Sequence, residues 1–324
     1  MAVVDNIRKL NSAVHKAMRG DTIDELEKTI RTFNEFISDI PDSSCAYLNQ
    51  SGTIDIRGIP KGIDQREFEI ALQLWDIHSY ICSMLLTTIW RTSQLQESLI
   101  IALNGQALIV GASASRALFE TACAFSVESS IMIDEIINAK REGINDAKDA
   151  TKFRIKLQNK VIKTAMGTRQ ASVLADFENF KRINIQTLID KAMNNLKIHE
   201  YYKFYEKLCD AVHPSYESFA SFWTEVGVND SRSQTRWLLN RYAMRPDELI
   251  DTIGLVSSWA LGQLRNDFFH FFAVCIDLGL AARLPWLLEP DNIEYFGLCK
   301  KPELYDICPC MSGKKWKFCK HSLS

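Results

Sequence analysis

Apolar residues recur three or four positions apart through most of this 324-residue chain, which is the spacing that places them on one face of an α-helix. Between residues 3 and 39 these positions run from Ile7 to Ile37, and a break near Gly20 divides two amphipathic helices. Internal repeats and low-complexity segments are absent. The pattern predicts an all-α protein built as a multi-helix bundle.

The remaining helices follow from the same periodicity and from end signals. Asp64 is an N-cap for a helix whose apolar positions continue to Ile89. The next predicted helix, about residues 94–138, is apolar on nearly every side and rich in small residues, which favours the centre of the bundle. Further helices are expected at residues 172–196, 199–224 and 246–284, the last capped by Asp247 after Pro246.

One early segment departs from helical spacing. Residues 43–63 carry Gly52, Gly58, Pro60 and Gly62, which indicates a loop or a short hairpin near residues 47–60. We therefore expect three parts, with a linker between Glu289 and Lys301 before the last: residues 1–63 (a helical pair and this loop), 64–290 (the bundle) and 299–324 (a small tail).

Charge is unevenly distributed along the chain. The composition is that of an ordinary globular protein, with 47% hydrophobic and 24% charged residues, and the formal net charge is −2. Residues 300–324 carry six lysines against Glu303 and Asp306, so the tail is about +4 and the remainder about −6. The tail is therefore the part expected to meet phosphate or an acidic partner.

Location is predicted from the apolar segments. The N-terminus has no basic region leading into an apolar run, so we expect a cytoplasmic protein with reduced thiols. The most apolar stretch, Ser98 to Val110, is interrupted at Asn104 and Gln106 and falls short of the roughly 20 residues that cross a bilayer. No membrane span is expected.

Five of the nine cysteines lie among apolar neighbours and are predicted to be small buried side chains: Cys45, Cys82, Cys123, Cys209 and Cys275.

The tail clusters Cys308, Cys310, Cys319 and His321 within a few basic residues. Thiolates and a neutral imidazole are the ligands of tetrahedral structural zinc sites. So short a segment cannot bury a core of its own, and Ser312-Gly313 supplies a chain reversal between the ligands. The sequence predicts a structural Zn²⁺ knuckle held by these four residues.

This tail resembles the SEC-C motif over about residues 305–321: Cys-x-Cys, then Ser-Gly-Lys-Lys-aromatic-Lys, then Cys followed by Cys or His. Met311 stands where the motif usually has glycine, and His321 comes one residue late. Cys299 or a ligand from another molecule therefore remains an alternative fourth ligand. SEC-C tails bind proteins, ribosomes or nucleic acid, so the resemblance implies docking.

The helix before the tail contains Arg265, Asn266 and His270. A guanidinium can hold a scissile phosphate, and an imidazole can move the ribose 2′-hydroxyl proton. The segment resembles the Arg-polar-x-x-x-His motif of HEPN-domain ribonucleases, all-helical proteins in which the motif lines a cleft between two protomers. The resemblance implies a homodimer with these three residues at its catalytic site. Alternatively, Arg265 and His270 are hydrogen-bonded residues at the edge of the core.

A second polar constellation comprises Arg116, Glu120 and His213. Arg116 and Glu120 lie one turn apart and are expected to form an ion pair, and His213 precedes Pro214 at a helix end, where it can cap carbonyls. Together with the tyrosines before His213, they resemble a family of helical bacterial domains of unknown function, often discussed beside HEPN and abortive-infection proteins. That resemblance implies that the three residues converge on one polar site.

Two functions follow. The first is a HEPN-like, metal-independent endoribonuclease that acts as a toxin or anti-phage effector and is docked to RNA or a ribosome by the knuckle. The alternative is a non-enzymatic helical adaptor or sensor that binds protein, ribosome or nucleic acid through the knuckle. The sequence has no phosphate-binding glycine loop after a strand, no His-Glu-x-x-His helix and no Gly-x-Ser-x-Gly elbow.

Overall fold

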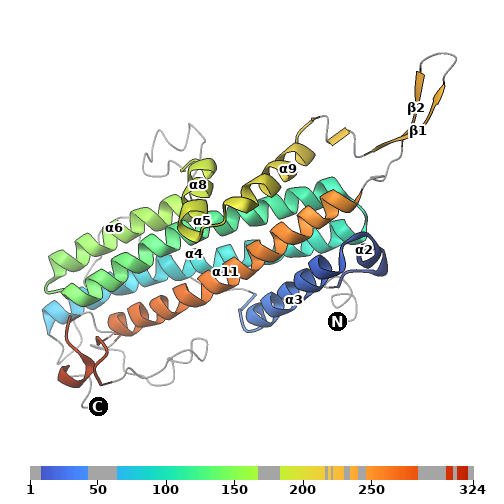
Figure 1. Cartoon of the computed structure of the whole chain (residues 1–324). Helices are drawn as coiled ribbons and strands as arrows, with labels where there is room; N and C mark the ends of the chain where they lie inside the picture. Colours follow the sequence, from blue (N-terminus) through green and yellow to red (C-terminus); the bar gives the residue numbers. More distant parts are fainter. Residues whose placement is uncertain are drawn as a thin grey trace. The chain divides into compact units, whose positions relative to one another are not determined.

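A computed structural model describes most of the chain: residues 9–42, 64–166, 183–215, 218–219, 222–229, 234–239, 246–283, 304–308 and 312–319. Helices dominate these residues, which confirms the all-α prediction (Figure 1). The loop or hairpin expected near residues 47–60 and the linker from Glu289 to Lys301 lie outside the described residues.

The chain divides into two compact units. Unit 1 comprises residues 1–38, 89–124 and 185–265, and unit 2 comprises residues 39–88, 125–184 and 266–324. Three long helices contribute one stretch to each unit: α4 (Gln65–Asn104), α5 (Leu108–Glu142) and α11 (Pro246–Arg283). α11 begins at Pro246 itself, one residue before the predicted cap, because the fixed φ of proline suits the first helical position.

Unit 1 begins with the predicted pair of helices. The side chain of Asn11 accepts hydrogen bonds from the N–H groups of Ala13 and Val14 at 3.0 and 3.1 Å, which caps the first helix. The elements that unit 1 adds to the long helices are α2 (Ser12–Ala17), α3 (Gly20–Ile37), α8 (Ile185–Leu196), the 3-10 turn η2 (His199–Tyr201), α9 (Tyr202–Val212) and two strands.

The predicted start of a helix near residue 94 is wrong, because α4 continues to Asn104 and the turn falls at residues 105–107. No glycine or proline interrupts residues 89–94, whereas Gly105 follows Asn104 directly. Gln106 completes the turn with a left-handed φ of 56°. Asn104 also accepts the backbone N–H of Asn11 at 2.8 Å, so the turn is held by a residue 93 positions away.

The predicted helix over residues 199–224 is interrupted after Val212, where α9 ends, and residues 213–215 are not helical. His213 adopts an extended conformation with ψ 153°, as expected for a residue that precedes proline. Two antiparallel strands follow that the helical periodicity did not predict, β1 (Trp223–Asn229) and β2 (Gln234–Leu239).

Close helix packing in unit 1 depends on Gly254 of α11. A Cβ atom added there would lie 2.7 Å from Thr22 and 2.9 Å from the sulfur of Met18. Ser115 of α5 also donates a hydrogen bond to the carbonyl of Ile253 at 3.3 Å. The missing side chain therefore lets α3 and the residues before it lie directly on the α11 backbone.

Unit 2 packs α6 (Ala147–Met166) with its stretches of α4, α5 and α11 and with the tail. Phe125 contacts Phe268 and Phe271 at ring-centroid distances of 4.8 and 5.8 Å. Arg154 and Asp76 form a buried ion pair at 2.8 Å, with side chains 1% and 7% exposed. Burial of these two charges is tolerated because they are paired.

One described helix, α5, is long and apolar enough to cross a membrane by length and composition. However, 56% of its most apolar stretch is buried inside the protein, as in the core helix of a folded bundle. This helix corresponds to the apolar helix that the sequence predicted at about residues 94–138, although it begins at Leu108.

We predict that Gly254→Ala lowers the free energy of unfolding by about 1–3 kcal/mol, because the new methyl group overlaps Thr22 and Met18. Gly262→Ala on the same helix is the matched control. Nothing lies within 4 Å of its added Cβ, so the substitution should stabilise the helix by up to about 1 kcal/mol. Urea unfolding midpoints measure both changes, and equal midpoint shifts would contradict the proposed overlap.

Candidate functional site

Arg116 and Glu120 lie one turn apart on α5 and form the predicted ion pair. The Nε atom of Arg116 is 2.8 Å from Oε1 of Glu120, and the two side chains are 26% and 23% exposed. The hydroxyl of Tyr205 on α9 donates to the same carboxylate oxygen at 3.0 Å. The carboxylate is therefore held from two elements and fixes the orientation of the guanidinium.

His213 completes the cluster at the end of α9. Its Nε2 atom lies 3.3 Å from Nη1 of Arg116, and the residue is exposed. Because a guanidinium only donates hydrogen bonds, this contact requires that Nε2 of His213 accept. The structure thus brings together the three residues that the sequence nominated, Arg116, Glu120 and His213, within unit 1.

Burial and the Glu120 carboxylate shift the pKa values of two groups in this cluster, Tyr205 and Arg116. The ring of Phe119 stacks on Tyr205 at 5.3 Å. Burial raises the pKa of Tyr205, and the Glu120 charge raises it further, so the phenol remains a donor. Burial acts to lower the pKa of Arg116, but the hydrogen bond and charge of Glu120 outweigh it, so the pKa is raised and the guanidinium stays cationic.

Two cysteines near the cluster are poor nucleophiles. Burial raises the pKa of Cys123 to about 12, with the charge of Glu120 acting in the same direction. Burial also raises the pKa of Cys209, which outweighs the lowering effects of Tyr205 and Arg116. Because the thiolate is the reactive form of cysteine, the chemistry available here belongs to the arginine and the histidine.

Tyr205 was not among the candidate site residues from sequence. It lies two helical turns before His213, with Cys209 between them, so the three residues share one face of α9 as the chain leaves the helix. That spacing could have identified Tyr205 as a neighbour of His213. The spacing does not reveal that this face of α9 lies against Arg116 and Glu120.

The second candidate site lies on α11. Asn266 and His270 are both exposed and one turn apart in unit 2, whereas Arg265 is partly buried and belongs to unit 1. At roughly 100° per residue, Arg265 and His270 point about 140° apart around the helix. The exposed polar stripe on this helix therefore contains the asparagine and the histidine but not the arginine.

The described part of the tail folds as a small hairpin in unit 2. Ile307 pairs with Lys315, and the N–H of Cys308 donates to the carbonyl of Lys314 at 2.8 Å. The 3-10 turn η4 (Trp316–Phe318) then leads into Cys319, whose N–H donates to Trp316 at 3.0 Å. Residues before and after Ser312-Gly313 are therefore paired with each other.

Two of the predicted zinc ligands are buried in this hairpin. Cys308 is 0% and Cys319 is 5% exposed. The other two, Cys310 and His321, and the alternative Cys299 lie outside the described residues. Within the described ranges, no group of three or more His, Cys, Asp or Glu side chains is placed to hold a metal. The buried sulfur atoms suit zinc as donors.

The tail hairpin lies against the C-terminal end of α5 through two glycines. A Cβ added to Gly143, whose φ is 80°, would lie 3.1 Å from the backbone of Ser312. A Cβ added to Gly313, whose φ is 71°, would lie 3.3 Å from the carbonyl oxygen of Arg141. Both positions combine a left-handed φ with close backbone contact, so glycine is needed at each.

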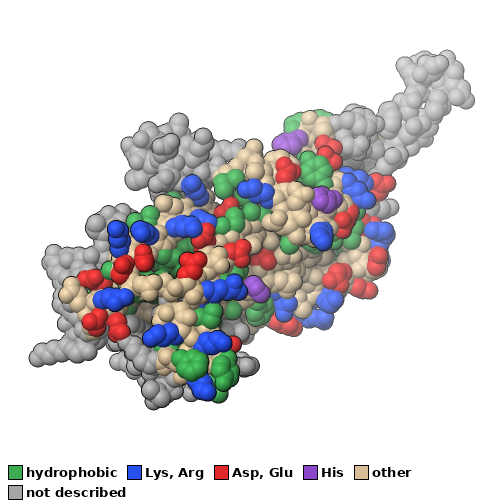
Figure 2. All heavy atoms as spheres, turned by 60° about the vertical axis from the view of Figure 1, so that its left-hand side comes forward, with side chains coloured by type: hydrophobic (Ala, Val, Ile, Leu, Met, Phe, Trp, Pro, Cys, Tyr) green, Lys and Arg blue, Asp and Glu red, His purple; other side chains and the backbone are tan. Residues whose placement is uncertain are grey.

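The outer surface of the tail combines aromatic and basic side chains. Tyr305 and Phe318 are 60% and 65% exposed. The ammonium groups of Lys315 and Lys317 lie 5.6 and 5.5 Å from the centre of the Tyr305 ring. Acidic and basic side chains are otherwise interspersed on the face of the molecule that Figure 2 shows. Exposed rings beside lysines can stack on bases and contact phosphates.

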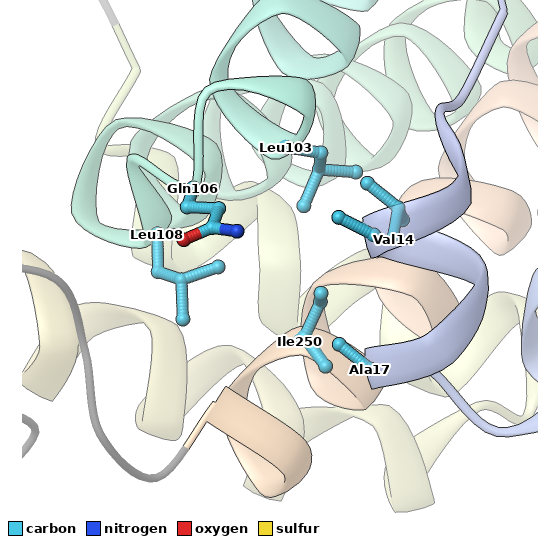
Figure 3. Close-up of a pocket in the computed structure, with 7 residues that line it drawn as sticks. Val14, Ala17, Leu103, Gln106, Leu108 and Ile250 are labelled. Carbon is cyan, nitrogen blue, oxygen red and sulfur yellow. The ribbon is translucent and has the colours of Figure 1, made fainter.

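A small apolar cavity of about 110 Å³ lies in unit 1 (Figure 3). Apart from Gln106, the side chains around it are aliphatic: Ala13, Val14, Ala17, Leu103, Leu108 and Ile250. It is too small for a nucleotide and holds no group suited to acid–base chemistry. The polar cluster around Arg116 is therefore the better candidate site.

Comparison with family models, with curated proteins and with solved structures finds no match to this chain. The candidate sites therefore rest on their geometry and on the sequence.

We predict that Gly143→Ala loosens the tail hairpin, because the left-handed backbone and the Ser312 contact both disfavour a side chain. A cost of about 1 kcal/mol corresponds to roughly fivefold faster exchange of the amide hydrogens that join the hairpin, such as those of Cys308 and Trp316. Hydrogen exchange with mass spectrometry measures this. Gly262→Ala is the control, and unchanged tail exchange in Gly143→Ala would contradict the contact.

Proposed function

We propose that this protein is a metal-independent endoribonuclease of HEPN-like character, with its catalytic centre at Arg116, Glu120 and His213. One observation carries the proposal: the Arg116 guanidinium is held between a carboxylate at 2.8 Å and an exposed imidazole at 3.3 Å. A fixed cation beside an accepting imidazole is the pair of groups that phosphodiester cleavage needs at neutral pH.

Each group has a defined role in this mechanism. The scissile phosphate binds to Arg116 in place of His213, and Nε2 of His213, freed from that contact, takes the proton of the ribose 2′-hydroxyl. The 2′-oxygen then bonds to phosphorus, the bond to the 5′-oxygen breaks, and the imidazolium or water protonates the leaving oxygen. Arg116 stabilises the charge that develops on the phosphoryl oxygens. Glu120 and Tyr205 are positioning residues, because they hold the guanidinium in place.

A second position for the same activity is the Arg265, Asn266 and His270 segment. It is favoured by the exposure of Asn266 and His270 on one face of α11. Because Arg265 lies on another side of the helix, this alternative requires a homodimer in which a second copy brings its own arginine to the exposed face.

The tail has a docking role in this proposal. A structural zinc ion held by Cys308, Cys310, Cys319 and His321, or by Cys299 in place of the histidine, would fold the tail. The support is the burial of Cys308 and Cys319, and the exposed rings and lysines beside them suit RNA or a ribosome. The enzyme then acts in the cytoplasm as a toxin or anti-phage effector.

We predict that His213→Ala lowers the rate of RNA cleavage by about 100-fold or more, because it removes the general base. Arg116→Lys should lower it similarly, since a lysine cannot keep both the Glu120 and the His213 contacts. The assay is cleavage of total RNA in the presence of chelator. His199→Ala, which changes another exposed histidine of unit 1, should retain wild-type activity.

The other outcomes decide between the candidate sites. Activity that survives His213→Ala but is lost in His270→Ala would move the centre to α11 and its homodimer. A wild-type protein that cleaves no RNA, or variants at both histidines that cleave normally, would overturn the ribonuclease. The adaptor or sensor would then be the better description.

We predict one zinc ion per chain, which Cys308→Ser and Cys319→Ser should each release, because each removes a buried thiolate ligand. Elemental analysis of the purified protein measures this content. Cys123→Ser, at a buried cysteine far along the chain from the tail, should retain the zinc.

Chelation should weaken binding to RNA or ribosomes while cleavage of a short RNA continues. Zinc-free protein with normal binding would contradict the docking role.

A further inference from the structure

Two helices of unit 2, α4 and α11, meet at two successive levels one turn apart. At the first level, His78 of α4 lies over Gly279 of α11, where an added Cβ would be 2.8 Å from the His78 Nε2 atom. At the second level, Cys82 lies one turn after His78 on α4. Its partner on α11 is Cys275, one turn before Gly279. Because α4 runs from unit 2 into unit 1 and α11 runs from unit 1 into unit 2, one turn forward on α4 corresponds to one turn back on α11, which places the two cysteines opposite each other.

The contacts at the second level agree with this placement. The sulfur of Cys82 lies 3.4 Å from Nε2 of His78 and also makes a side-chain hydrogen bond with Cys275. The three side chains therefore form a chain from imidazole to thiol to thiol. Both cysteines are unbridged free thiols.

The two thiols differ in accessibility. Cys275 is only 3% exposed, whereas Cys82 and His78 are partly exposed. Burial also raises the pKa of Cys275 well above its ordinary value, so this thiol reacts with a sulfur held against it rather than with a reagent from solution. A reagent from solution therefore meets Cys82 first, beside a base that can take its proton, and finds a second thiol directly behind it.

We propose that Cys82 and Cys275 are a peroxide-reactive thiol pair in which His78 activates Cys82. The sequence alone predicted only small buried side chains at these two positions. The proposal is independent of the ribonuclease, because all its residues lie in unit 2 and none belongs to the Arg116 cluster.

The reaction balances with hydrogen peroxide as the oxidant. His78 accepts the Cys82 proton, and the thiolate attacks one peroxide oxygen, so that an S–O bond forms and the O–O bond breaks. The departing hydroxide takes the proton back from His78 and leaves as water. Cys275 sulfur then attacks the Cys82 sulfenic acid, an S–S bond forms, and the S–O bond breaks. The second hydroxide takes the Cys275 proton. Two thiols lose two electrons, and one peroxide becomes two waters.

The first test identifies the product in the full-length protein. After brief treatment with dilute hydrogen peroxide, peptide mapping by mass spectrometry should find a Cys82–Cys275 disulfide. In Cys275→Ser the reaction should stop at a Cys82 sulfenic acid, which dimedone traps. Cys209→Ser is the matched control, because Cys209 is also partly exposed but contacts Tyr205. This variant should form the Cys82–Cys275 disulfide at the wild-type rate.

The second test asks whether His78 activates the thiol. His78→Gln should slow trapping of Cys82 by at least about tenfold, because the base is lost. Gly279→Ala should act in the same direction, since its methyl group displaces His78 while leaving both thiols in place. Gly262→Ala should have no effect. Oxidation of Cys82 no faster than of Cys209, or a disulfide that forms only in urea, would overturn the proposal.

Discussion

Two glycines of α11 allow a close contact in each unit. In unit 1, Thr22 and Met18 pack against Gly254, and in unit 2, His78 packs against Gly279. At each position an added Cβ would lie under 3 Å from the facing atom, a separation that packed side chains do not tolerate. Neighbouring side chains therefore lie directly against the backbone of α11. At Gly279 this close contact holds the His78 imidazole beside the Cys82 thiol, and the His78–Cys82–Cys275 chain depends on it.

In the Arg116 cluster, the partly buried groups fix the arginine in place and the histidine stays exposed. Glu120 and Tyr205 hold the guanidinium, while His213 stands at the exposed end of a helix that proline terminates. Burial and the carboxylate keep the tyrosine protonated, and the carboxylate keeps the arginine cationic against the effect of burial. The imidazole is the group of the cluster that is exposed to solvent. That division of roles is the basis of the proposed cleavage mechanism.

Helical periodicity predicted the fold class, the break after the first short helix and the cap at Asp64, which accepts N–H groups of Arg66 and Glu67. It failed where a boundary depended on contacts remote in sequence. Asn104 ends α4 while bonded to Asn11, and nothing local to residues 89–94 marks that choice. The strands β1 and β2 were also missed, because the segment between the helices predicted at residues 199–224 and 246–284 carries no alternation strong enough to indicate strands.

The candidate residues themselves came from sequence: Arg116, Glu120 and His213 by type and local spacing, and the tail cysteines by clustering. Only the tertiary structure decided that α9 lies against α5, so that His213 reaches Arg116 and Tyr205 joins the site. It likewise decided that Cys82 and Cys275 meet. Spacing along a helix determines which residues share a face, but the burial of apolar surface between helices determines which faces touch, and that is a property of the whole fold.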